Sequence, residues 1–297
     1  MNVKISRGVD IKLKGVADRV YANVPNSEFY ALKPTDFHLV IPKMVVKIGD
    51  VVEAGDILFY DKNNEAIKFS SSVSGVVSDI VRGDKRKILE VVIKVDSDIK
   101  YKKFETPDLP SLNRDSIINF LLISGLWPLI RQRPFGTIAN PKDSPKSIFI
   151  SAFDSSPLAP DNDFIFHGDK EFFQLGLDIV SQLSDGTTHV NLDGNSNSAN
   201  VFNNAKGVQI NHIYGPHPAG NVGVQIHHID PINKGDIVWY LSPQDLVTIA
   251  RYFKEGKYDA SKIISLTGSK VKKARYYRVI QGMSITSIIK DNLHEGD

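Results

Sequence analysis

The chain has 297 residues, of which 41% are apolar and 24% charged, a composition typical of globular proteins that excludes a disordered or collagen-like chain. This length predicts one to three domains. Thirty-six basic residues against thirty-four acidic ones leave a formal net charge of +2, so charge alone indicates no nucleic-acid partner.

Cysteine usage and hydropathy narrow the class further. The sequence contains no cysteine, which excludes disulfides, thiolate zinc sites and cysteine-ligated iron–sulfur clusters. The N-terminus lacks the apolar core of a signal peptide. The longest apolar stretch, residues 117–130, is interrupted by Asn119, Ser124 and Pro128 and is too short to span a bilayer. We therefore expect a cytoplasmic protein that is soluble or peripheral to a membrane.

Residues 1–105 are expected to form an all-β domain. Segments rich in Val and Ile cover residues 37–46, 57–60, 73–81 and 88–95. Two Gly-Asp turns, Gly49-Asp50 and Gly55-Asp56, lie six residues apart. This pattern resembles the biotinyl/lipoyl barrel-sandwich. The turn that would carry the modified lysine of that family contains Lys62 without a neighbouring Met, so we favour a structural module over a lipoyl-type carrier.

A proline-containing linker at residues 106–111 precedes a mixed region, residues 106–257. We predict a helix capped by Asp115, a helix capped by Asp169, and a helix begun by Ser242-Pro243 and ended by Gly256. Strands are expected over residues 147–152, 188–192, 207–213 and 237–241. The alternation predicts a Rossmann-like α/β layer with a mostly parallel sheet, and hence an α/β multidomain protein.

Residues 258–297 return to β character. Apolar and β-branched residues mark strands over residues 263–268, 276–280 and 282–289. We interpret them as a β-grasp module, which we expect to be truncated because the last segment would lack its closing strand.

Standard catalytic motifs are missing. The sequence has no G-x-G-x-x-G, phosphate-loop, H-E-x-x-H or G-x-S-x-G pattern. Four histidines, at positions 212, 217, 227 and 228, fall close together, but no carboxylate stands at ligand spacing. We therefore expect no catalytic residue and no metal site in this chain.

The segment from Ser124 to Phe135 is the main candidate for ligand binding. Trp127 and Phe135 flank Arg131 and Arg133, which suits a flat apolar ring carrying carbonyl acceptors, such as a quinone. The alternative is a buried Trp with surface arginines.

Four strings together carry a family resemblance: GLWPLIRQRPF (125–135), SAFDSSPLAP (151–160), GPHPAGNVG (215–223) and LTGSKVKKARYYRVIQGMSI (266–285). In this order they resemble the A-subunit family of the sodium-translocating NADH:quinone reductases. That family is in turn similar to the C subunit of the Rnf-type complex and to the NADH-binding flavoprotein of complex I. Leu126 and Trp127 stand where those relatives have the glycines of a flavin loop.

The resemblance implies a peripheral subunit that binds ubiquinone or menaquinone and contacts other subunits of a sodium pump. It implies the cytoplasmic side of the bacterial inner membrane, with no FMN and no iron–sulfur cluster in this chain. Within this chain we place the quinone near Trp127, Arg131, Arg133 and Phe135, with His38, Phe153 and His217 as secondary candidates. A flavin-binding electron-transfer subunit of Rnf type and a lipoyl-type carrier remain alternatives.

Overall fold

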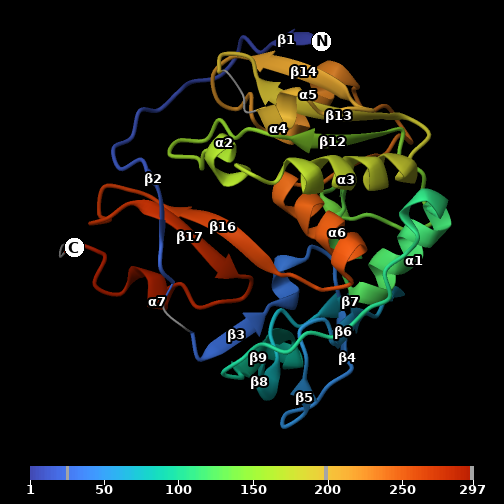
Figure 1. Ribbon diagram of the computed structural model, residues 1–297, viewed down its shortest axis with the longest axis vertical. Helices are drawn as coiled ribbons and strands as arrows, with labels where there is room; N and C mark the ends of the chain where they lie inside the picture. Colours follow the sequence, from blue (N-terminus) through green and yellow to red (C-terminus); the bar gives the residue numbers. More distant parts are fainter. Residues whose placement is uncertain (25–26, 197–199, 295–297) are drawn as a thin grey trace.

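The structure is a computed structural model that describes residues 1–24, 27–196 and 200–294 (Figure 1). Over these residues the strands form four sheets, of seven, four, three and three strands. Two of the smaller sheets form the lower part of the view in Figure 1, and the large sheet with its helices forms the upper part.

The two lower sheets make a barrel-sandwich. One has the strand order β3-β9-β8-β5 and the other β4-β6-β7. Their buried residues, including Phe59, Phe69, Val77 and Val91, belong to one apolar core. The strands are β3 (Phe29–Leu32), β4 (Pro42–Met44), β5 (Val51–Val52), β6 (Ile57–Asp61), β7 (Asn64–Ser70), β8 (Gly75–Arg82) and β9 (Ile88–Val95).

The two Gly-Asp turns are confirmed, and they are built alike. Asp50 Oδ2 accepts from the Lys47 backbone N–H at 2.9 Å, and Asp56 Oδ2 accepts from the Glu53 backbone N–H at 2.8 Å. Strand β7 was not predicted, because its sequence lacks a clear apolar alternation before Ile67. The predicted strand over residues 37–46 is confined to β4.

The large sheet has the order β1-β14-β13-β12-β15-β10-β11. Strands β1, β14, β13, β12 and β15 run parallel, while β10 is antiparallel to both of its neighbours, β15 and β11. The chain moves outward from β12 through β13 to β14 and then returns to place β15 on the other side of β12, so its direction reverses between β12 and β15. The strands are β1 (Asn2–Lys4), β10 (Arg131–Arg133), β11 (Thr137–Ile138), β12 (Ser147–Ser151), β13 (Thr187–Asp193), β14 (Gln209–Tyr214) and β15 (Val238–Tyr240).

Helices cover both faces of this sheet. Ile148 and Ile150 of β12 belong to the core that contains α3 and α6, whereas Phe149 packs with Ile226 of α5. This alternation explains why the three central residues of the strand, 148–150, are all apolar. The helices are α1 (Arg114–Ser124), α2 (Asn162–Ile165), α3 (Lys170–Val180), α4 (Asn200–Asn203), α5 (Val222–Ile229) and α6 (Pro243–Glu255), with single 3-10 turns at Pro34–Asp36, Asp84–Arg86, Leu109–Ser111, Trp127–Leu129 and Ser181–Leu183.

The predicted start and end of α6 are confirmed. Ser242 accepts from the Asp245 backbone N–H at 3.1 Å, and Gly256 adopts the left-handed conformation, with φ 62°. The predicted cap of α1 is wrong. The helix begins two residues earlier, because the Asn113 side chain accepts from the Ser116 backbone N–H in a capping box. His227 and His228 lie in the last turn of α5.

The remaining sheet has the order β16-β17-β2, from β16 (Ser261–Leu266), β17 (Arg275–Ile280) and β2 (Asp18–Ala22). The strand predicted over residues 282–289 is wrong: Gly282 lies in a turn, Met283 makes an isolated β-bridge to Tyr30, and α7 (Thr286–Ile289) follows. Its isoleucines at 285, 288 and 289 fall at helical spacing.

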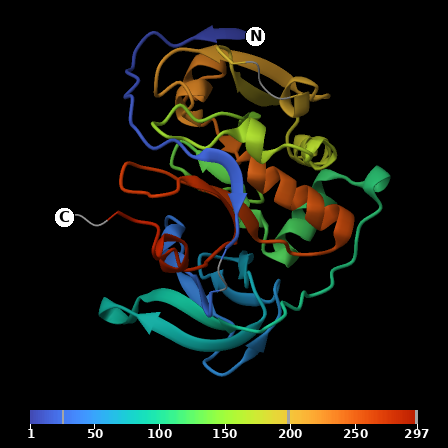
Figure 2. The ribbon, with the colours of Figure 1, turned by 60° about the vertical axis from the view of Figure 1, so that its left-hand side comes forward.

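The first 22 residues lie outside the barrel-sandwich sheets. Strand β1 pairs with β14, and β2 pairs with β17. Figure 2 shows this segment running along one side of the molecule from the large sheet to the small one. Such pairings join residues about two hundred positions or more apart, which local sequence patterns do not reveal.

Candidate functional site

A hollow of about 320 Å³ lies beyond the carboxyl ends of β12 and β15, where the strand order reverses. We call it the switch-point hollow. Open α/β sheets bind their ligands at this position. Its apolar lining includes Phe153, Tyr240 and Leu241, and its polar lining includes Ser151 and Asn162.

The loops around the hollow are held in place by close backbone packing. Gly220 lines the hollow, and a Cβ at this position would lie 2.3 Å from the Ser155 backbone nitrogen. The Gly220 N–H donates to Ser155 Oγ at 2.8 Å. Because no side chain fits there, the loop before α5 can approach the loop that follows β12.

One predicted residue, Phe153, lines this hollow, and a second, Arg133, lies beside one of its lining residues. The Arg133 guanidinium lies 5.0 Å from the ring centroid of Tyr240, which also lines the hollow. Arg133 Nε is buried and has no hydrogen-bond partner in the described part of the chain. This donor is unusual, because buried N–H groups normally have an acceptor.

His217 supports the same region without lining the hollow. Its Nδ1 lies 3.1 Å from Ser155 Oγ, and its backbone N–H donates to Asp10 Oδ1 at 2.9 Å. It therefore connects the loop before α5 to the N-terminal segment.

Trp127 and Phe135 have contrasting environments. Trp127 is fully buried, donates its indole N–H to the Ala139 carbonyl at 2.7 Å, and packs edge-to-face on Trp239 with ring centroids 5.5 Å apart. Trp239 precedes Tyr240 in β15. Phe135 lies between β10 and β11 and is 79% exposed.

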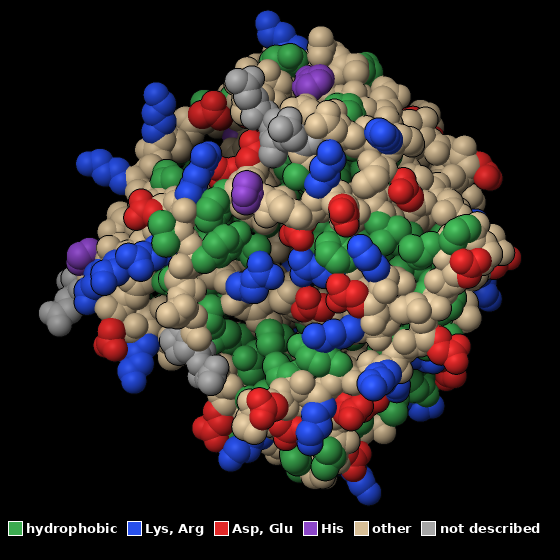
Figure 3. All heavy atoms as spheres, viewed as in Figure 1, with side chains coloured by type: hydrophobic (Ala, Val, Ile, Leu, Met, Phe, Trp, Pro, Cys, Tyr) green, Lys and Arg blue, Asp and Glu red, His purple; other side chains and the backbone are tan. Residues whose placement is uncertain are grey.

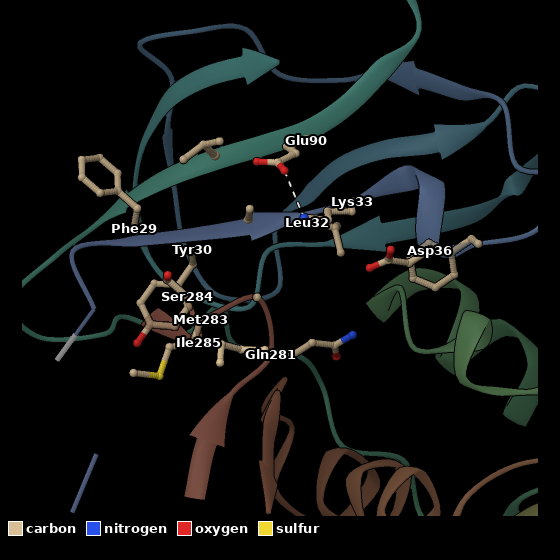
Figure 4. A pocket seen from close by; sticks show the side chains of 14 residues that line it. Phe29, Tyr30, Leu32, Lys33, Asp36, Glu90, Gln281, Met283, Ser284 and Ile285 are labelled. Atoms are coloured by element: carbon tan, nitrogen blue, oxygen red, sulfur yellow. Dashed lines mark ion pairs between the residues drawn. The ribbon is translucent and has the colours of Figure 1, made fainter. Parts of the chain in front are cut away.

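Arg131 and His38 belong to a different part of the molecule. The Arg131 guanidinium lies 6.0 Å from the ring centroid of Phe37, and His38 is an exposed turn residue directly after it. Phe37 lines a second pocket of about 610 Å³, between the barrel-sandwich and residues 281–285, which we call the inter-module pocket. Figure 4 shows its Lys33–Glu90 ion pair. Of the seven predicted residues, Phe153 lines the switch-point hollow, and Arg133 and His217 lie close to it. Arg131 and His38 lie close to Phe37 at the inter-module pocket, and Trp127 and Phe135 line neither.

The turn that would correspond to a flavin loop is tightly packed. Leu126 and Trp127 are buried, and a Cβ on Gly125 would lie 2.3 Å from Ser70 Oγ. The Ser70 hydroxyl donates to the Ser124 carbonyl at 2.7 Å, which joins this turn to the barrel-sandwich. The space beside Gly125 is about 40 Å³, far below the roughly 300 Å³ at which small-molecule sites begin. The residues here do not fit an isoalloxazine ring.

Sequence reasoning missed Ser151 and Tyr240, which line the switch-point hollow. Each ends a strand of the parallel sheet. Because the strands over 147–152 and 237–241 were predicted, their carboxyl ends could have been identified as a site once the strand order was known.

Among the described residues, no group of three or more His, Asp or Glu side chains is placed to hold a metal ion. No helix formed by residues 1–24, 27–196 and 200–294 has the length and apolar character needed to cross a membrane.

Comparison with known proteins identifies two domains. Residues 3–96 match the family described as the NqrA N-terminal barrel-sandwich hybrid domain, and residues 112–258 match the NqrA second alpha/beta domain. Among solved structures, an NAD⁺-reducing [NiFe]-hydrogenase covers 67% of this chain and 45% of its own, with a TM-score of 0.43 and 12% identity, a likeness too slight to support an argument.

Whole-chain relatives agree with the domain matches. The chain is 34% identical over 297 residues to the Na(+)-translocating NADH-quinone reductase A subunit of Photorhabdus laumondii, 35% over 301 residues to that of Glaesserella parasuis, and 34% over 298 residues to that of Alcanivorax borkumensis. Each alignment covers 99% of this chain and 66% of the relative. The chain thus spans about two thirds of the length of these relatives and belongs to the NqrA family, the A subunits of the Na(+)-translocating NADH-quinone reductases.

Proposed function

We propose that this protein binds ubiquinone or menaquinone in the switch-point hollow, as the A subunit of a sodium-translocating NADH:quinone reductase. The observation that carries the proposal is the pair of aromatic side chains, Phe153 and Tyr240, lining the hollow, with the Arg133 guanidinium 5.0 Å from the Tyr240 ring centroid. A hollow of about 320 Å³ falls within the usual range for small-molecule sites.

The chemistry of the hollow suits a quinone ring. Phe153 and Tyr240 offer apolar faces to a flat ring, while Arg133 supplies a guanidinium beside Tyr240 that can donate to a ring carbonyl. In this proposal Trp127 does not contact the quinone. It packs against Trp239, the residue before Tyr240 in β15, and so supports the position of Tyr240. The chain contributes binding rather than turnover, so the isolated protein should not oxidise NADH.

The proposal places the protein at the cytoplasmic face of the bacterial inner membrane, attached to other subunits and carrying neither FMN nor an iron–sulfur cluster. The packing of Leu126 and Trp127 supports the lack of flavin. A basic surface supports contact with partner subunits: four bases lie within residues 270–275, and Figure 3 shows Lys and Arg gathering along the left edge of the molecule.

We also propose that the central domain is Rossmann-like and that the last residues belong to a β-grasp module. The reversal of strand order between β12 and β15 favours a Rossmann-like layer for residues 106–257. The β16–β17 hairpin of residues 258–297, to which β2 is paired, is interpreted as part of a β-grasp module. The predicted domain of residues 1–105 is kept as the barrel-sandwich domain for strands β3 to β9.

Equilibrium dialysis of the purified chain against ubiquinone-1 tests the proposed site. We expect Phe153→Ala and Arg133→Gln each to weaken binding about tenfold, because each removes about 1.4 kcal/mol of ring contact or hydrogen bonding. Arg131→Gln is the matched control, an identical change two residues away that should alter affinity by less than about twofold. Loss of binding in Arg131→Gln with no effect of Phe153→Ala would move the quinone to the inter-module pocket.

A lipoyl-type carrier is the second candidate, because Lys62 is exposed in the β6–β7 turn. We expect the peptide that contains Lys62, from protein purified from its native host, to have its unmodified mass, since no Met flanks Lys62. An added lipoyl or biotinyl mass that disappears in Lys62→Arg would establish the carrier function.

A further inference from the structure

A chain of buried amides crosses the sheet and ends at the switch-point hollow. Ser151 of β12, Asn191 of β13 and Asn211 of β14 stand directly opposite one another in adjacent strands. Asn191, Asn211 and Gln225 are fully buried, and His189 is 5% exposed. Polar side chains in a parallel sheet interior are costly unless every one of them is hydrogen-bonded.

The hydrogen bonds run in one continuous line. Asn211 Nδ2 lies 3.2 Å from His189 Nδ1 and donates to Asn191 Oδ1 at 2.8 Å. Asn191 Nδ2 donates to Gln225 Oε1 at 2.8 Å. Gln225 Nε2 donates to Ser151 Oγ at 2.9 Å and to the Ala219 carbonyl at 3.0 Å.

One backbone group fixes the direction of this chain. The Ala219 carbonyl can only accept, so Gln225 must turn its NH₂ group toward it, and its Oε1 must then face Asn191. That orientation obliges Asn191 to donate to Gln225 and to accept from Asn211, whose second N–H faces His189. A flip of any one amide would set two donors or two acceptors against each other.

The fixed orientation of Gln225 determines where the hydroxyl hydrogen of Ser151 points. Because Ser151 Oγ accepts from Gln225, its own hydrogen must point elsewhere, and the carbonyls of Phe153 and Gly220 lie at 3.0 and 3.2 Å. Ser151, Phe153 and Gly220 all line the hollow. The hydroxyl hydrogen is therefore held at the wall of the hollow, where a ligand oxygen can replace one of these two carbonyls as its acceptor.

We propose that Ser151 is a specificity-determining residue that donates a hydrogen bond to a ligand carbonyl in the switch-point hollow, and that Gln225 is the positioning residue that fixes Ser151 as a donor. This inference rests on the proposed function, which places a quinone in the same hollow. It adds a requirement that ring size and apolarity do not impose: the ligand must present an acceptor oxygen at the carboxyl end of β12.

The test compares two rings of similar shape by equilibrium dialysis. Duroquinone carries two carbonyl acceptors, and hexamethylbenzene carries methyl groups in their place. We expect Ser151→Ala to weaken duroquinone binding about fivefold, the usual worth of one hydrogen bond, and to leave binding of hexamethylbenzene unchanged. Gln225→Met, with Ser151 intact, should weaken duroquinone binding about threefold for the same reason.

Ser181→Ala is the matched control, since it removes an unpartnered hydroxyl outside this hydrogen-bond chain. It should leave both affinities unchanged. If Ser151→Ala binds duroquinone as tightly as the parent protein, or weakens both ligands equally, the inference is wrong while the proposed site stands. If the parent protein binds neither ring, the proposed function itself fails.

Discussion

Gly176→Leu should lower the free energy of unfolding by about 3 kcal/mol, because it forces a large side chain between two closely packed helices. Gly176 lies in α3 where it crosses α6. A Cβ at this position would lie 2.6 Å from Leu246 Cγ and 2.7 Å from the Leu246 carbonyl oxygen. The second contact is with backbone, so it cannot be relieved by a change of rotamer, and the two helices would have to separate.

Urea unfolding of the parent and the variant measures this effect. Glu171→Leu, on an exposed position of the same helix, is the matched control. Its ion pair with Lys254, at 3.6 Å and largely exposed, should contribute little. A loss in Gly176→Leu no larger than that in Glu171→Leu would show that α3 and α6 are not in close contact at this glycine.

His189 should make the stability of the protein depend on pH. Its burial lowers the pKa to about 4 from the ordinary value of 6.5. Neutral His189 also suits its position, because Nδ1 faces the Asn211 N–H at 3.2 Å and the ring stacks on Phe149. The folded state therefore disfavours the protonated form, and stability is fully present above about pH 6.5 and falls as the pH drops toward 4.

Linkage gives a magnitude to this effect. Between pH 7 and pH 5, His189 binds a proton in the unfolded chain but stays mostly neutral in the folded chain. This difference should reduce the free energy of unfolding by about 2 kcal/mol. His189→Gln keeps an acceptor for Asn211 and removes the titration, so its unfolding should lack this part of the pH dependence. Equal pH dependence in the parent and His189→Gln would mean that His189 titrates normally in the folded protein.

Local signals predicted the elements that depend on local chemistry. Ser242, Pro243 and Gly256 bracket α6 because capping and backbone preference act within one helical turn. The Gly-Asp turns at Gly49 and Gly55 follow for the same reason. By contrast, the pairing of β1 with β14 joins segments of the chain that no local pattern connects.

The candidate site likewise combines features that local sequence indicates with contacts that only the folded chain reveals. The aromatic and arginine pattern of residues 127–135 indicated a binding region, but it did not reveal that Arg133 lies over Tyr240 while Arg131 lies over Phe37. The sequence alone does not show whether the Trp127 ring contacts a ligand or, as in the structure, packs against Trp239. The buried polar residues Asn191 and Asn211 interrupt apolar strands, and only the strand register shows that they meet.

A crystal structure of this chain soaked with ubiquinone-1 would locate the bound quinone directly. We expect its ring between Phe153 and Tyr240, with one carbonyl within hydrogen-bond distance of Ser151 Oγ. A ring found in the inter-module pocket beside Phe37, with the switch-point hollow empty, would contradict the proposed site.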